Sequence, residues 1–189
     1  MVVIRSYNYA GVPPDTLAQA RATAIRTFEH AGIELKWVDC ETSSIVDRPS
    51  SIVDRPETCA VPLREGAEFV LRLLTAPQAI AGSPRHFAMG STIVDHDSGI
   101  GAVTTVDPRL VSNIARAASA DYPTLLGRAI AHEIGHLLLG HSRHSRDGLM
   151  RAVWSQEELR GIRPAGWQFS GAEAAQMRHG LAGRARAAN

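Results

Sequence analysis

The stretch HEIGHLLLGHSRHSRDGLM, residues 132–150, limits the possible structure of this chain more than any other part of its sequence. It opens with His-Glu-x-x-His, in which His132 and His136 are four residues apart. On an α-helix this spacing puts both imidazoles on one face, one turn from each other. Two imidazoles so placed can occupy two corners of a tetrahedral zinc site, with bonds of about 2.0 to 2.1 Å. The spacing therefore predicts a helix that carries part of a metal site.

The residues around the motif also favour a helix, from just after Pro123 to about Leu139, with Gly140 as its end. At about 100° per residue, one side of this helix is apolar and the two histidines point roughly the opposite way. The apolar positions are Leu126, Ile130, Ile134, Leu137 and Leu138. We therefore expect one side to pack in the core and the other to carry the chemistry.

Two further residues inside the motif are informative. Glu133 lies beside the first histidine without being forced to bind the metal, so its carboxylate can take a proton from a metal-bound water and pass it to a leaving amine. A glycine inside a helix costs about 1 kcal/mol relative to alanine, so Gly135 indicates a requirement for close packing at that position.

The third metal ligand must come from a residue after Gly140 that leads the chain back by about one helical pitch, roughly 5.4 Å. His141 is one residue past this glycine and reaches about 3.8 Å, whereas His144 is four residues past it and reaches up to about 13 Å. We therefore favour His144 as the third ligand and keep His141 as the alternative.

Three acidic residues are also candidates for the third position: Asp147, Glu157 and Glu158. A glutamate there would make a His₂Glu site of the kind found in other zinc peptidases. However, Ser155 and Glu158 have the spacing of a capping box that opens a short helix, which gives these acids a structural role.

The motif and the residues after it resemble the metzincin zinc peptidases, whose pattern is H-E-x-x-H-x-x-G-x-x-H followed by a Met-turn. The similarity is closest to compact bacterial metzincin-like proteins, in which HEIGHLLLG is followed by HS, by G-(I/L/V)-M and by a nearby tryptophan. In this sequence those features are His144-Ser145, Gly148-Leu149-Met150 and Trp154.

This resemblance implies a zinc-dependent peptidase, and more specifically an endopeptidase, that hydrolyses peptide bonds with a metal-activated water. Glu133 would act as general base and then as general acid. Met150 would form the hydrophobic floor beneath the metal. A peptide or protein substrate would bind in extended form along an edge strand, here residues 86–94, by strand addition.

The sequence departs from the metzincin pattern in two ways. The glycine comes one residue late, and His144 follows His136 by eight residues instead of six. No tyrosine follows Met150, so a Met-turn tyrosine that could stabilise the oxyanion is missing. An alternative function is therefore a catalytically silent, zinc-stabilised scaffold that binds peptides or proteins. Glu133, which a purely structural zinc site does not need, favours the enzyme.

The rest of the chain predicts an α/β (α+β) domain with a mixed, twisted sheet of about five strands. β-Branched or alternating segments predict strands at 2–7, 33–40, 68–75, 86–94 and 102–107. A backing helix is expected at 15–31. A C-terminal helix should begin after Ser170, which forms a capping box with Glu173, and end near Gly180, with the last six residues frayed.

Length and charge narrow the class of protein. The chain has 189 residues, which fits one domain over residues 1–189, and we expect a monomer. Its formal net charge is +1 and it has no apolar run of membrane-spanning length, so neither a nucleic-acid nor a membrane partner is expected. The sequence as given has no signal peptide, and the localisation stays open.

Cys40 and Cys59 are nineteen positions apart and lack the spacing of a zinc ribbon or a redox pair. A disulfide between them would stabilise the protein by about 3 kcal/mol in an oxidising compartment, and two free thiols are the alternative. Removal of an export signal would be consistent with a disulfide.

The segment between the two cysteines repeats SSIVDRP at 43–49 and 50–56, which we interpret as a duplication in a surface loop.

Overall fold

Five strands form one mixed sheet in the order β2-β1-β3-β5-β4. The computed structural model describes residues 1–40, 57–64, 66–75, 89–95, 101–160 and 164–187. The strands are β1 (Val2–Asn8), β2 (Leu35–Asp39), β3 (Glu68–Leu73), β4 (Gly90–Thr92) and β5 (Val103–Val106). The first four strands in the sheet order are parallel, and β4 runs antiparallel to β5 at one edge.

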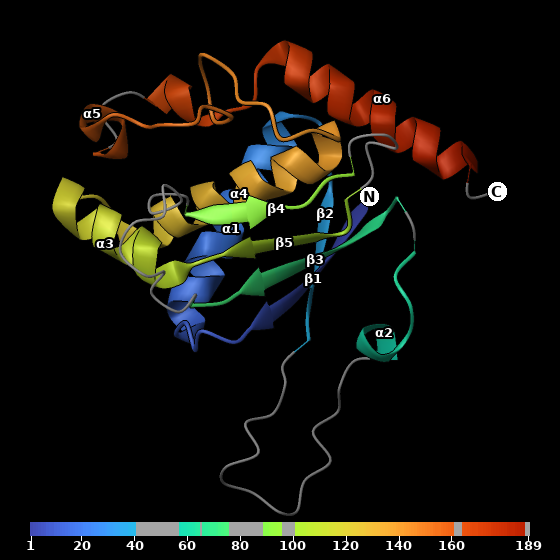
Figure 1. Cartoon of the computed structure of the whole chain (residues 1–189), viewed down its shortest axis with the longest axis horizontal. Helices are drawn as coiled ribbons and strands as arrows, with labels where there is room; N and C mark the ends of the chain where they lie inside the picture. The colour runs from blue at the N-terminus through green and yellow to red at the C-terminus, as the bar shows by residue number, and fades with distance from the viewer. Residues whose placement is uncertain (41–56, 65, 76–88, 96–100, 161–163, 188–189) are drawn as a thin grey trace, which may run out of the picture.

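Helices cover one face of this sheet, with α1 (Pro14–His30) and α4 (Tyr122–Leu139) lying side by side behind it (Figure 1). The C-terminal helix α6 (Gly171–Ala187) packs against α4 and lies along the top of the molecule in the same view. The remaining helices are α2 (Glu57–Ala60), α3 (Pro108–Ala118), α5 (Gln156–Leu159) and the short 3₁₀-helix η1 (Pro164–Trp167).

The core lies between the sheet and the helices. Alternate residues of the central strands point into it and are almost fully buried, while α1 and α4 contribute their apolar faces. The largest of these side chains are Phe28, Phe69, Ile4, Leu71, Leu73, Leu125, Leu126, Ile130, Ile134, Leu137 and Leu138. The core therefore holds α4, which bears the His-Glu-x-x-His motif, directly against β3, β4 and β5.

The predicted fold class, an α/β (α+β) domain with a mixed five-stranded sheet and several helices, is confirmed. The sequence interpretation missed α3, although Asp107 caps it by accepting from the Arg109 and Leu110 N–H groups and Pro108 begins it. It also missed the one-turn helix α2. The expected strand at 86–94 is present only as β4, and residues 86–88 lie outside the described part of the chain.

The prediction that the C-terminal helix ends near Gly180 was wrong, because α6 continues to Ala187. Arg184 explains the difference. Its guanidinium donates hydrogen bonds to the Leu137 and Leu138 carbonyls of α4 and lies 6.0 Å from the centre of the Phe69 ring. These contacts hold the last turns of α6 on the domain, which local sequence signals alone do not reveal.

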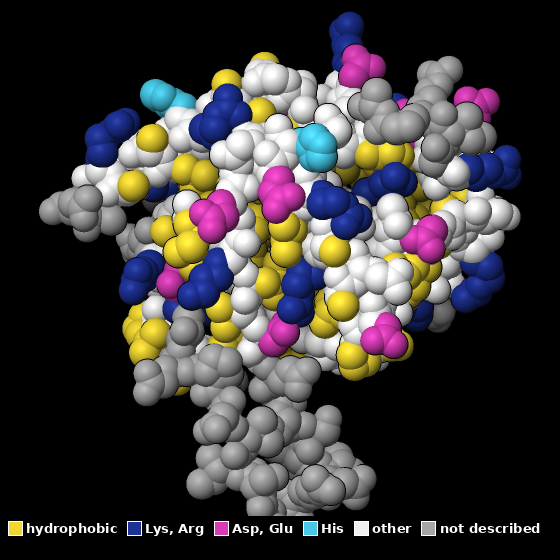
Figure 2. Space-filling view, turned by 180° about the vertical axis from the view of Figure 1, so that it is seen from behind, with side chains coloured by type: hydrophobic (Ala, Val, Ile, Leu, Met, Phe, Trp, Pro, Cys, Tyr) yellow, Lys and Arg dark blue, Asp and Glu magenta, His cyan; other side chains and the backbone are white. Residues whose placement is uncertain are grey.

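The alternatives left open for the two cysteines are resolved in favour of the disulfide, since Cys40 is bonded to Cys59 and their Cα atoms are 5.7 Å apart. Both copies of the SSIVDRP repeat lie outside the described residues. Within the described chain, no helix is long and apolar enough to cross a membrane. On the face shown in Figure 2, cationic and anionic side chains are interspersed among apolar ones.

Helices α1 and α4 approach closely at Gly127. A Cβ atom added at this position would lie 2.3 Å from the Ala20 carbonyl oxygen and 2.7 Å from Cβ of Thr23. Both neighbours belong to α1, and one of them is backbone that cannot turn away. Glycine at 127 is therefore what lets α4 pack directly on α1.

We expect Gly127→Ala to lower the free energy of unfolding by about 1 to 3 kcal/mol, because the added methyl group overpacks this crossing. Denaturant unfolding of the purified protein measures the change. Gly183→Ala in α6 is the matched control, since a Cβ there meets no atom within 4 Å. The control should be neutral or stabilising by up to about 1 kcal/mol. Equal effects of the two substitutions would contradict close packing at Gly127.

Candidate active site

Helix α4 places three polar side chains of the motif in a buried position. His132, Glu133 and His136 are 8%, 7% and 4% exposed. The helix begins at the N-cap Asp121, whose side chain accepts from the Thr124 N–H, and ends at Gly140, whose φ of 72° is left-handed. The end at Gly140 is as predicted, but the helix begins at Tyr122, just before Pro123 and not after it, because Asp121 caps it and a proline fits its first turn. The motif lies in the last two turns.

Backbone carbonyls determine which ring nitrogen carries the proton in the two motif histidines. Nδ1 of His132 lies 2.9 Å from the Leu149 carbonyl oxygen, and Nδ1 of His136 lies 2.9 Å from the His141 carbonyl oxygen. A carbonyl can only accept, so each Nδ1 must donate its proton there. In a neutral ring Nε2 then has a free lone pair, and the two Nε2 atoms lie 3.1 Å apart. The hydrogen bonds from Nδ1 to the two carbonyls therefore turn the Nε2 lone pairs of both rings toward one point.

His144 brings a third imidazole to the same point. Its ring centre lies 5.3 Å from that of His132 and 5.0 Å from that of His136. One nitrogen from each of the three histidines lies within 4.8 Å of the others. The side chain of His141 is not part of this group, and its backbone carbonyl instead orients His136. The lengthened loop after Gly140 thus returns to the helix at residue 144.

The acidic alternatives lie elsewhere. Asp147 and Glu157 are exposed. Glu158 is buried, but its carboxylate accepts from the Ser155 N–H in the predicted capping box and forms an ion pair with Arg151. Burial raises the pKa of Glu158, but hydrogen bonds from Arg151 and Ser155 outweigh it and lower this pKa to about 2.

The three-histidine group suits a zinc ion. Burial lowers the pKa of His132 to about 4 and that of His136 to about 4, with further lowering by the neighbouring histidines, so both rings are neutral near pH 7. Burial also lowers the pKa of His144. Three imidazoles whose nitrogens converge match the donor set of a catalytic zinc site that leaves a fourth position open.

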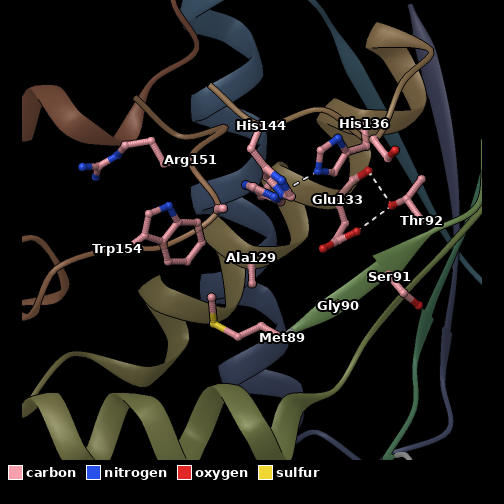
Figure 3. A pocket seen from close by; sticks show the side chains of 13 residues that line it. Met89, Gly90, Ser91, Thr92, Ala129, Glu133, His136, His144, Arg151 and Trp154 are labelled. Carbon is pink, nitrogen blue, oxygen red and sulfur yellow. Dashed lines mark hydrogen bonds between the residues drawn. The ribbon is translucent and has the colours of Figure 1, made fainter. Parts of the chain in front are cut away.

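The edge strand β4 holds the carboxylate of Glu133. The Thr92 hydroxyl donates to Oε2 of Glu133 over 2.6 Å (Figure 3). The same hydroxyl is 2.8 Å from the Thr104 hydroxyl on β5. Burial raises the pKa of Glu133 to about 7, and the Thr92 and Thr104 hydroxyls act in the opposite direction. Sequence analysis missed both threonines, because the contact between Thr92 and Glu133 spans 41 residues and has no local signal.

Gly90 lets β4 approach this carboxylate. A Cβ atom built on Gly90 would lie 2.6 Å from Cγ and 2.7 Å from Oε1 of Glu133. Any side chain at position 90 would therefore displace the Glu133 carboxylate. The position of the acid depends on a glycine in a different element of the fold.

The three histidines and Glu133 line one cavity of about 250 Å³, between β4 and the loop that follows α4 (Figure 3). Met89 and Ala129 form an apolar part of its wall. Trp154 packs edge-on against the His132 ring, with centres 5.7 Å apart, and donates to the same Leu149 carbonyl that orients this histidine. The tryptophan in the predicted position thus supports the first histidine.

Met150 is fully buried and packs against α4 at Gly135. A Cβ atom on Gly135 would lie 2.7 Å from the Met150 sulfur and 2.8 Å from the Phe169 ring. This contact accounts for the glycine inside the helix, where the sequence indicated close packing. The turn that contains Met150 also presents the Leu149 carbonyl to His132.

Comparison with protein-family models and with curated proteins gave no match. One solved structure with a similar fold is a zinc-dependent peptidase from Methanocorpusculum labreanum (strain Z). The two structures agree with a TM-score of 0.55 at 17% sequence identity, over 92% of this chain and 99% of that chain. At this identity the likeness shows that the two proteins share a fold, nearly from end to end.

We expect His144→Ala to lose most of the bound zinc, because it removes one of three converging nitrogens. His141→Ala is the matched control and should keep its zinc, since its backbone carbonyl still accepts from His136. Metal content per protein after dialysis, measured by atomic emission, distinguishes the two. Zinc loss in His141→Ala with retention in His144→Ala would overturn the assignment of the third ligand.

Proposed function

We propose that this protein is a zinc-dependent endopeptidase with a metzincin-like active site. The observation that supports this most strongly is the convergence of three histidine nitrogens beside the Glu133 carboxylate, all lining one cavity next to the edge strand. The shared fold with a zinc-dependent peptidase is consistent with the proposal.

In the proposed reaction, His132, His136 and His144 hold the metal and Glu133 transfers the proton. A zinc ion there would supply Lewis-acid polarisation of the scissile carbonyl and a lowered pKa for the attacking water. Thr92 donates to Oε2 of Glu133, so Oε1 is the oxygen left to accept the proton of that water. The same carboxyl group then passes the proton to the leaving amine, so that water is added across the peptide bond.

We further propose that the substrate is an internal segment of a peptide or protein that lies along β4. This strand is the last in the sheet order, and its residues 90–92 line the cavity. A peptide added to such an edge forms main-chain hydrogen bonds that do not depend on its sequence. Among the described residues of the cavity wall, Arg151 is the one side chain with a permanent positive charge, and it is paired with Glu158. This pairing favours an internal segment over a substrate held by its terminal carboxylate.

The zinc-loaded protein should therefore cut members of a diverse peptide mixture, and Glu133→Gln should lower this cleavage by about 10² to 10⁴-fold. The substitution removes the proton acceptor but keeps an oxygen to accept from Thr92. Mass spectrometry of the products gives the rates and the bond preference. Zinc content of both proteins is the control, since the variant must keep its metal for the comparison to test Glu133.

The same experiment tests the alternative of a silent scaffold. If neither protein cuts any peptide although both hold zinc, the peptidase proposal is contradicted and a binding role becomes the better account. A chelator provides a second check, because its addition should abolish cleavage and restored zinc should recover it.

Gly90→Ala should reduce peptide cleavage by about 10²-fold without loss of zinc. The added methyl group would displace the Glu133 carboxylate, and a misplacement of about 1 Å at a catalytic group can cost this much. Rates and zinc content are measured as above. Ser91→Ala is the matched control on the same strand and should retain most of the activity. A fully active Gly90→Ala protein would show that Glu133 does not need this close contact.

A further inference from the structure

The loop that provides His144 closes on itself. The N–H of Ser145 donates to the Met150 carbonyl over 2.9 Å, and Ser145 forms an isolated parallel bridge with Arg151. Within this loop the Leu149 N–H donates to the Gln168 carbonyl over 2.9 Å. We call residues 144–151 the ligand loop, since the proposed third ligand begins it and the Met150 turn ends it.

Two carboxylates hold the ends of the ligand loop, and both belong to helix capping boxes. Glu173 of α6 accepts the Ser170 N–H at Oε2 over 2.7 Å, while its Oε1 accepts the Ser145 hydroxyl. Each oxygen therefore has a separate partner, one that caps the helix and one in the loop. Glu173 is 9% exposed, whereas Ser145 is exposed, so the contact between them is partly buried.

Glu158 of α5 is arranged in the same way. Its Oε2 accepts the Ser155 N–H over 2.8 Å, and its Oε1 pairs with the Arg151 guanidinium. Arg151 also donates from Nε to the Gly148 carbonyl over 3.1 Å, which ties the pair into the turn. The two capping acids thus hold the two bridged ends of one loop, Ser145 and Arg151.

His144 depends on this support more than the other two histidines do. His132 and His136 are buried on a helix, and each is oriented by a backbone carbonyl. His144 is exposed, and no hydrogen bond to another described residue orients its ring. Its ring packs beside those of His132 and His136, but without a hydrogen bond its place depends mainly on the backbone that carries it, one residue before Ser145.

We propose that Glu158 and Glu173 are positioning residues for the third metal ligand: each caps its own helix with one carboxylate oxygen and braces the ligand loop with the other. This inference rests on the proposed zinc site. It gives the segment after the motif a specific role, since α5 and α6 each supply one carboxylate that holds the loop bearing His144.

Paired variants separate the contact of each glutamate with the ligand loop from its role in capping a helix. Ser145→Ala removes the contact with Glu173 but leaves the capping box of α6, whereas Ser170→Ala removes the capping hydroxyl but leaves Ser145 bound to Glu173. The zinc dissociation constant of each purified protein is measured by competition with a chromophoric chelator. Thermal unfolding of the metal-free proteins is recorded in parallel.

We expect Ser145→Ala to weaken zinc binding by about 10-fold to 100-fold, the usual effect of losing an outer contact of a metal ligand. Its metal-free melting temperature should stay close to that of the wild type, because Ser145 is exposed. Ser170→Ala should show the reverse, a lower melting temperature with unchanged zinc affinity. Ser145→Thr retains the hydroxyl and should restore wild-type affinity.

Arg151→Met tests the second contact with the ligand loop, the ion pair between Arg151 and Glu158, and Ser155→Ala is its control. Loss of a nearby positive charge would by itself favour Zn²⁺ binding. Weaker binding in Arg151→Met therefore reports lost positioning and not lost charge. The visible spectrum of the cobalt(II)-substituted proteins should change in Ser145→Ala and Arg151→Met, because the geometry of the third ligand changes, and should not change in the two controls.

The outcomes distinguish this inference from the proposed function. If the wild-type protein binds no zinc, the metal site itself is wrong. If the wild type binds zinc, and Ser145→Ala and Arg151→Met bind it with wild-type affinity and spectrum, the braces are not needed and this inference is overturned while the zinc site stands. Zinc affinity that falls equally in variants and controls would also overturn it, since that result reflects general stability.

Discussion

The structure around the candidate active site depends on two buried imidazole nitrogens that face each other 3.1 Å apart. Because both Nδ1 protons go to backbone carbonyls, neither Nε2 atom of His132 or His136 can donate to the other while the rings are neutral. Two lone pairs in such contact repel unless a cation lies between or beside them. The carbonyls that orient the rings belong to Leu149 and His141, so the loop after α4 takes part in defining the candidate metal site.

This constraint explains why the chain after the motif is built as it is. The loop must present one carbonyl to each motif histidine, return His144 to the other two histidines and bury Met150 against Gly135. The capping acids of α5 and α6 and the contact of Trp154 with the His132 ring all bear on this loop. The last two helices therefore complete the site as well as covering the core.

The opposite wall of the cavity comes from the sheet. β4 is only three residues long and antiparallel to its neighbour, yet it provides Thr92 to the Glu133 carboxylate and Gly90 to make room for it. A short edge strand can hold these two residues in place because it pairs with β5 and also packs against α4. The fold shared with a zinc-dependent peptidase at 17% identity shows that this arrangement of sheet and helices does not need a similar sequence overall.

The sequence by itself determined the features that depend on neighbours within a few residues. These are the helix and the common face of His132 and His136, the stop at Gly140, and the capping boxes of Ser155 and Ser170, because helical spacing and capping act over three or four residues. Chain reach favoured residue 144 over 141, but only the tertiary structure brought that ring to the motif. It also decided the disulfide, the contact between Thr92 and Glu133, and the second partner of each capping acid. Those contacts join residues far apart along the chain, and their formation depends on how the elements pack.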